Sequence, residues 1–232
     1  MSLLTDRLNR MGVPTHVMVY TDGWAATMGD GSGPLQFLGP LRAFGTDGNW
    51  YVTFYRLPDG KTYEDVRGEA TTEYIQAAGD AAAMVLDIRK PGGQQWGASW
   101  VRYIIGHPHE LPAPVDVAIP LPNGNQMISA PEVFAADEAA EVFISYYRTG
   151  DIPAGYVLRP VEGYRADGSV MDLRGVEEFG EPTAVPDVAG RRRRPRPPPY
   201  ELSRKLKPAT PHTFWTTSVP CTPISPPYIR PG

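Results

Sequence analysis

Residues 139–158 read AAEVFISYYRTGDIPAGYVL, and this stretch predicts a helix that lies on a sheet and turns into a strand. Asp137 is a good N-cap, Gly150 suits a left-handed C-cap, and Pro153 prevents the helix from continuing. Apolar residues recur at the spacing of one helix face: Ala139, Val142, Phe143, Tyr146 and Tyr147. Such a corner is typical of a chain whose helices cover a sheet.

Before this corner, the sequence predicts strands and a short helix. Residues 49–57 (NWYVTFYRL) are rich in aromatic and β-branched residues, and a Pro-Asp-Gly turn leads from them to residues 61–66, so we expect a hairpin. Residues 71–81 (TTEYIQAAGDA) are predicted to form a short helix capped by one of the leading threonines. Residues 81–90 (AAAMVLDIRK) end before Pro-Gly-Gly and indicate a buried strand.

Further strands complete the predicted sheet. Residues 96–106 (WGASWVRYIIG) form one strand, and residues 155–164 (GYVLRPVEGY) form the last. Residues 114–133 are predicted to form a second hairpin with Asn123-Gly124 as its turn pair, and prolines push its first arm to a sheet edge. The predicted fold class is α+β, a mostly antiparallel sheet with one or two helices packed on a face.

The composition changes abruptly near residue 186. We expect residues 1–185 to form a single α+β domain, best defined over residues 49–158, and residues 186–232 to form a basic, proline-rich tail. The tail buries too little apolar surface to offset its chain entropy, so we predict that it is disordered with polyproline II character.

The run Arg191–Arg194 leaves several interpretations open. It could neutralise nucleic-acid phosphates, it could belong to a ligand for a proline-binding domain, or it could be a solvated appendage, which we favour. A further hypothesis is that the tail arises from out-of-frame translation past a disrupted stop in GC-rich DNA. Apart from this run, we expect no contact with nucleic acid.

The net charge of −4 conceals an acidic body and a basic tail. Residues 1–189 carry 13 Lys and Arg against 25 Asp and Glu, a net of −12, whereas the remaining residues carry a net of +8. An acidic body suits a partner with a basic surface, although acidic surfaces also keep proteins soluble.

Several classes of protein are disfavoured by composition. No apolar run approaches the roughly 20 residues of a membrane span, and the first residues lack the pattern of a signal peptide, so we expect a cytoplasmic protein without membrane contact. The single cysteine, Cys221, excludes an internal disulfide framework and a cysteine-rich zinc site, and we interpret it as a bystander.

The most tempting cluster for chemistry is His107, His109 and Glu110, because His-x-His beside a carboxylate can bind a divalent metal. A third ligand is not marked, and Pro108 interrupts the strand, so a polar turn is the favoured interpretation. The chain has no Gly-x-Ser-x-Gly and no phosphate-binding GxxxxGK[ST]. We therefore predict no enzyme activity, no metal site and no cofactor.

The strand at residues 49–57 carries aromatic side chains on both faces. Alternation places Trp50, Val52 and Phe54 on one face and Tyr51, Thr53 and Tyr55 on the other. One face belongs to the core. The other face is either a surface for a protein partner or is covered by further structure.

The order of these elements, with FISYYRTGDIPAGYVL at the corner, resembles an actinobacterial immunity-protein family, type one among the Imm families of polymorphic toxin systems. In that family, a helix ending in Arg/Glu-Thr-Gly and then x-x-Pro precedes a last strand that often carries Trp. Arg148, Thr149, Gly150 and Pro153 match this ending, and Tyr156 or Val157 occupies the usual Trp position. The resemblance covers residues 49–158 and leaves the continuation past Pro160 and the basic tail unexplained.

This resemblance implies a protein that binds a cognate toxin, often a nucleic-acid deaminase or nuclease, and masks its active site. An acidic surface would steer association with a basic toxin, and aromatic residues would anchor it. The expected toxin contacts are Asp59, Glu64, Asp65, Asp87, Trp96 and Trp100.

Two alternatives remain open at the level of sequence. One is a regulatory or interaction module that uses the basic, proline-rich tail to contact nucleic acid or a proline-binding domain. The other is an enzyme of unrecognised type that uses His107 and His109.

Overall fold

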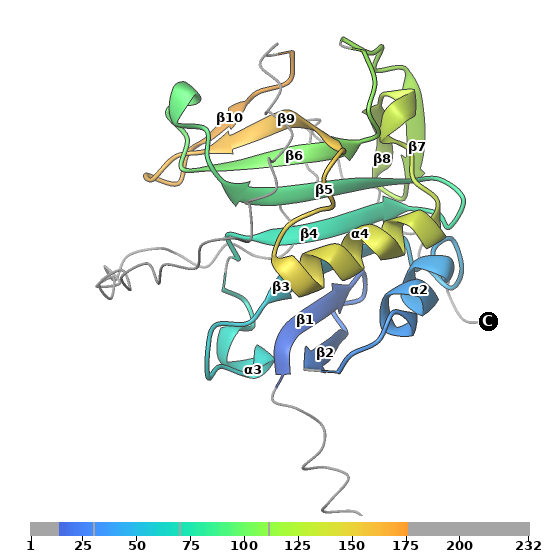
Figure 1. Cartoon of the computed structure of the whole chain (residues 1–232), viewed down its shortest axis with the longest axis vertical. Coiled ribbons are helices and arrows are strands. Elements are labelled where there is room, and N and C mark those ends of the chain that lie inside the picture. The colour runs from blue at the N-terminus through green and yellow to red at the C-terminus, as the bar shows by residue number, and fades with distance from the viewer. Residues whose placement is uncertain (1–13, 30, 70, 111, 176–232) are drawn as a thin grey trace, which may run out of the picture.

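The computed structural model describes residues 14–29, 31–69, 71–110 and 112–175, which form an α+β domain (Figure 1). One antiparallel sheet has the strand order β10-β9-β6-β5-β4-β3-β1-β2, and β7 and β8 form a separate hairpin. The strands are β1 (Pro14–Tyr20), β2 (Ala25–Gly29), β3 (Tyr51–Arg56), β4 (Tyr74–Gly79), β5 (Met84–Pro91), β6 (Trp100–Gly106), β7 (Val117–Leu121), β8 (Gly124–Ile128), β9 (Val157–Tyr164) and β10 (Val170–Asp172). The predicted fold class is confirmed.

Two helices, α2 (Leu35–Arg42) and α4 (Ala136–Thr149), cover one face of this sheet (Figure 1). The predicted apolar stripe of α4 is confirmed, because its residues pack in the main core with residues of β1, β3, β4, β5 and β6. Gly150 is the left-handed C-cap, with φ of 75°. The predicted N-cap is wrong: the N-cap is Ala135, two residues earlier, and Asp137 lies in the first turn of α4, paired with Arg42 of α2.

Three short helices complete the described elements: α3 (Tyr63–Val66), η1 (Gln94–Trp96) and η2 (Ala130–Glu132). The hairpin predicted after residue 57 is wrong, because α3 takes the place of its second arm. A capping box explains α3, since the Asp65 carboxylate accepts hydrogen bonds from both the backbone N and the hydroxyl of Thr62 at 2.8 Å.

The helix predicted at residues 71–81 is also wrong. Residues 74–79 form β4, which pairs with β3 on one side and β5 on the other. Ile75 and Ala77 pack in the core under the helices, whereas Ala78 packs on the opposite face. Because both faces are covered, no polar alternation marks the strand, and pairing with two neighbours overrides the local helix signals.

Two boundaries differ from the prediction by a few residues. The β7–β8 turn consists of Pro122 and Asn123, because Leu121 pairs with Gly124. The strand predicted from residue 96 begins only at Trp100, and η1 precedes it. The strand predicted at residues 155–164 is confirmed as β9, which pairs with β6, but it is not the last strand, because β10 follows it and pairs with its other edge.

The second face of the sheet is covered in part by the β7–β8 hairpin. Ile119 and Ile128 of the hairpin pack on Val85 of β5 and Ile104 of β6. Strand alternation predicts Trp50 on the helix-covered face, but Trp50 precedes β3 and packs with this second cluster. The domain boundary near residue 186 and the predictions for the tail lie outside the described residues.

Candidate binding site

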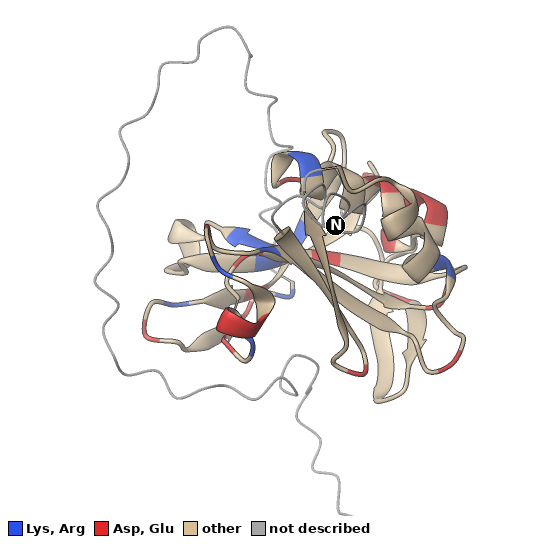
Figure 2. Ribbon diagram, turned by 90° about the horizontal axis from the view of Figure 1, so that it is seen from below, with Lys and Arg blue, Asp and Glu red and all other residues tan. Residues whose placement is uncertain are grey.

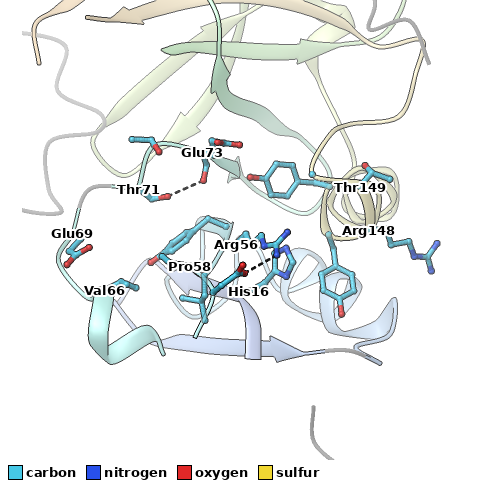
Figure 3. Close-up of a pocket in the computed structure, with 16 residues that line it drawn as sticks. His16, Arg56, Pro58, Val66, Glu69, Thr71, Glu73, Arg148 and Thr149 are labelled. Carbon is cyan, nitrogen blue, oxygen red and sulfur yellow. Dashed lines mark hydrogen bonds and ion pairs between the residues drawn. The ribbon is translucent and has the colours of Figure 1, made fainter. Parts of the chain in front are cut away.

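A cavity of about 780 Å³ lies where the C-terminal end of α4 meets the connections between β3, α3 and β4 (Figure 3). Its walls come from three segments far apart in the sequence. They are β1, through His16; residues 55–73, through Tyr55, Arg56, Leu57, Pro58, Asp59, Val66, Glu69, Thr71, Thr72 and Glu73; and the end of α4, through Tyr146, Tyr147, Arg148, Thr149 and Gly150.

Aromatic rings form much of this wall. The buried His16 ring stacks on Phe54 with a centroid distance of 5.2 Å and meets the edge of Tyr147 at 5.0 Å. The Tyr147 hydroxyl donates a hydrogen bond of 2.6 Å to the carbonyl oxygen of Gly29, which fixes its ring. Burial raises the pKa of Tyr55 to about 12 and also raises the pKa of Tyr146. Tyr55 and Tyr146 are therefore uncharged at neutral pH.

The end of α4 is held by side-chain contacts of the residues that the sequence resemblance singled out. The Thr149 hydroxyl donates to the Ser145 carbonyl oxygen at 2.8 Å and accepts from the Asp151 backbone N at 3.1 Å. Lys90 of β5 pairs with the Asp151 carboxylate at 2.8 Å. With Gly150 as the cap, these contacts give the wall a fixed shape.

Carboxylates are frequent on the segment between β3 and β4. Asp59, Glu69 and Glu73 line the cavity, and Glu64 and Asp65 lie on α3, which contributes Val66 to the lining. We call Asp59, Glu64, Asp65, Glu69 and Glu73 the acidic rim, and all five are exposed. Figure 2 shows in red where acidic residues occur along the ribbon of the whole domain. Hydrogen bonds from the Thr62 backbone and hydroxyl lower the pKa of Asp65. Asp65 is therefore negatively charged at neutral pH.

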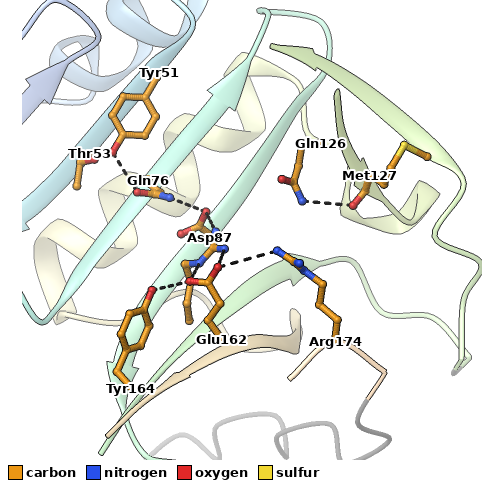
Figure 4. Close-up of polar contacts among 10 residues, drawn as sticks. Tyr51, Thr53, Gln76, Asp87, Gln126, Met127, Glu162, Tyr164 and Arg174 are labelled. Atoms are coloured by element: carbon orange, nitrogen blue, oxygen red, sulfur yellow. Dashed lines mark hydrogen bonds and ion pairs between the residues drawn. The ribbon is translucent and has the colours of Figure 1, made fainter. Parts of the chain in front are cut away.

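A second polar cluster crosses the other face of the sheet (Figure 4). The Gln76 amide and the Arg102 guanidinium donate to the same oxygen of Asp87, at 2.8 and 3.3 Å. Arg102 also forms a two-pronged ion pair with Glu162, at 3.0 and 2.7 Å, and the Tyr164 hydroxyl donates to Glu162 at 2.6 Å. Strand register explains the arrangement, because Gln76 lies opposite Asp87 and Arg102 lies opposite Glu162.

This second cluster makes stability depend on pH. Burial raises the pKa of Asp87 to about 6, since it outweighs the opposing effects of Arg102 and Gln76. The value in an unfolded chain is about 3.9, so the folded state holds the proton more tightly. The resulting contribution to stability is fully present below about pH 4 and is lost as the pH rises through 6, a loss of about 3 kcal/mol.

We therefore predict that Asp87→Asn removes this titration. Urea unfolding of wild type and variant between pH 4 and pH 7 measures it. The free energy of unfolding of the wild type should fall, relative to that of the variant, by about 2 kcal/mol over this range. Identical pH dependence in the two proteins would exclude Asp87 as the titrating group.

The side chains of His107 and His109 form structural contacts with neighbouring segments of the chain. The two ring nitrogens of His107 contact the Pro131 carbonyl oxygen and the Glu138 carboxylate, each at 2.6 Å, and the ring stacks on Phe134. His109 Nδ1 contacts the His107 carbonyl oxygen at 2.7 Å. Within residues 14–175, apart from the three single gaps, no group of His, Cys, Asp and Glu could hold a metal ion.

The structure separates the six expected toxin contacts into three places. Asp59, Glu64 and Asp65 belong to the acidic rim: Asp59 lines the cavity, and Glu64 and Asp65 lie on α3. Asp87 is 1% exposed and belongs to the cluster on the other face. Trp96 packs against the main core from η1, and Trp100, at the start of β6, lies opposite Tyr164 of β9.

Sequence reasoning missed several residues of the cavity. Glu69 and Glu73 lie beside and within the stretch predicted to be a helix, and His16 lies about 40 residues or more before every other wall segment. The only available signal was the density of carboxylates between residues 59 and 73, which exceeds that of the neighbouring sequence.

The chain matches no protein-family model, no curated protein and no solved structure at a significant level. In the part of the chain that the structure describes, no helix combines the length and hydropathy that a membrane span requires. The functional argument therefore depends on the geometry of the site.

Proposed function

We propose that the chain is a non-enzymatic immunity protein of the type-one Imm family, which acts in the cytoplasm by binding a cognate toxin and covering the toxin's active site. A nucleic-acid deaminase or nuclease is the expected class of toxin. Such a toxin presents a basic surface to nucleic acid, and an acidic protein competes for that surface through charge complementarity.

One observation carries this proposal. Three carboxylates of the acidic rim, Asp59, Glu69 and Glu73, line a cavity with aromatic walls, so charge for steering and rings for anchoring occur in one place. Three of the contacts expected from sequence, Asp59, Glu64 and Asp65, lie on this rim. The residues of the family signature, Arg148 to Gly150, form one wall of the same cavity.

We predict that the double variant E69K/E73K fails to protect cells that co-express it with the cognate toxin, which is to be sought among the genes directly upstream. Reversing two rim charges should slow association and weaken toxin binding by about tenfold or more. Purified proteins give the rate constants by surface plasmon resonance, and the salt dependence of association should become shallower.

The matched control is E110K/D116K. These two carboxylates are exposed on the connection between β6 and β7, away from the cavity, and the change in net charge is the same. This control should protect as the wild type does. Death of cells that contain excess soluble wild-type chain would overturn the proposed function. Full protection by E69K/E73K would show that the acidic rim does not contribute to toxin binding.

A further inference from the structure

The charges inside the cavity are unbalanced. Arg56 is already paired with Asp59 at 3.2 Å, and the Arg148 side chain points away from the cavity (Figure 3). Glu69 and Glu73 line the cavity, and neither carboxylate forms an ion pair or a side-chain hydrogen bond with another described residue. Two carboxylates are thus available, whereas both lining guanidinium groups are engaged or directed elsewhere.

The aromatic walls, like the two carboxylates, favour a positively charged ligand. Tyr55, Tyr146 and Tyr147 line the cavity together with the carboxylates. A tyrosine ring attracts a cation over its face, and a planar guanidinium stacks on it more effectively than an ammonium does. A guanidinium also has the fork of donors that matches a carboxylate, and it loses little hydration on entry.

We infer that the cavity binds the guanidinium of an arginine side chain, which the partner protein inserts between the tyrosines and the carboxylates of Glu69 and Glu73. This inference rests on the proposed function and adds a specific anchor to it. A volume of about 780 Å³ accommodates the side chain with its flanking backbone. Arginine is among the residues that contribute most to protein interfaces when they are buried in such pockets.

The test uses the full chain and the blocked peptide acetyl-Gly-Arg-Gly-amide as the probe. Titration followed by ¹H–¹⁵N NMR should give saturable shifts at Tyr146, Tyr147 and His16, with a dissociation constant on the order of 1 mM. The double variant E69Q/E73Q should bind at least tenfold more weakly. The matched variant E110Q/D116N should bind the peptide as the wild type does. The NMR spectra of both double variants report whether each protein is folded.

Blocked Gly-Lys-Gly and Gly-Gln-Gly peptides complete the experiment. Weaker binding of the lysine peptide and no binding of the glutamine peptide support a guanidinium site. Equal affinity for arginine and lysine, no shifts with arginine at ten times the expected dissociation constant, or unchanged affinity in E69Q/E73Q would each overturn the inference.

The outcomes separate this inference from the proposed function. A chain that binds the arginine peptide at these residues but does not protect against its upstream toxin retains the arginine site and loses the immunity role. A chain that protects, and in which E69Q/E73Q leaves peptide binding unchanged, retains the immunity role and loses the arginine site.

Discussion

Replacing Gly79 with alanine is expected to lower the free energy of unfolding by about 4 kcal/mol, a large share of the stability of an ordinary domain. Gly79 ends β4 opposite Met84 and has φ of 138°. An added Cβ would lie 2.4 Å from the Ala83 carbonyl oxygen and 2.7 Å from the Met84 Cα. Both are backbone atoms, so the clash can be relieved only by a shift of the backbone where β4 turns into β5.

Urea unfolding measures this loss, and Gly150→Ala is the matched control. Gly150 also has positive φ, at 75°, but a Cβ there would meet nothing within 4 Å. The control therefore isolates the strain of a left-handed alanine, which costs about 1–2 kcal/mol. Equal losses in the two variants would contradict the close backbone contact at Gly79.

The second large effect is expected at Glu132, where alanine should cost about 3–5 kcal/mol. The Glu132 side chain is 2% exposed and accepts two hydrogen bonds from Arg159 of β9, at 2.6 and 2.8 Å. It also accepts from the Ser129 backbone N at 2.7 Å, which closes the capping box of η2. Alanine would leave Arg159 without its carboxylate, at 16% side-chain exposure, and η2 without its cap.

A second ion pair of similar geometry provides the comparison. Arg42 and Asp137 join α2 to α4 through two hydrogen bonds of 2.7 Å, but their side chains are 57% and 66% exposed. Water screens such a pair, so Asp137→Ala should cost much less than Glu132→Ala. Chemical unfolding of both variants decides the point, and comparable losses would show that burial is not the controlling factor.

Local signals predicted the parts of the fold that local interactions determine. The end of α4 needs only Gly150 and Pro153, and the apolar stripe needs only the helix period, so all of these could be located in the sequence. The strands β3, β5, β6 and β9 were also found, because β-branched and aromatic residues are dense in them.

The errors occurred where distant segments determine the conformation. Residues 74–79 form a strand because β3 and β5 flank them, and neither pairing is visible within an 11-residue window. The sequence predicts Asp87 as a surface carboxylate in contact with a partner. It is buried because Gln76 and Arg102, on two other strands, supply hydrogen bonds that no pattern within β5 reveals.

The candidate site was predictable only in part for the same reason. Asp59, Glu64 and Asp65 are close in sequence, and a single connection places them together. The cavity beside them also requires His16 and the α4 residues Tyr146 and Tyr147, which the tertiary fold alone brings to the same place.

The cavity walls come from three segments that are far apart in the sequence, so ligand binding to the cavity is coupled to folding of the chain. Unfolding separates β1, the β3–β4 connection and the end of α4, so the unfolded chain has no binding site to offer. By mass action, a ligand present at 100 times its dissociation constant raises the free energy of unfolding by about 2.7 kcal/mol. A rise in the melting temperature of the chain therefore reports that a partner has bound to the cavity, whatever the chemical identity of that partner.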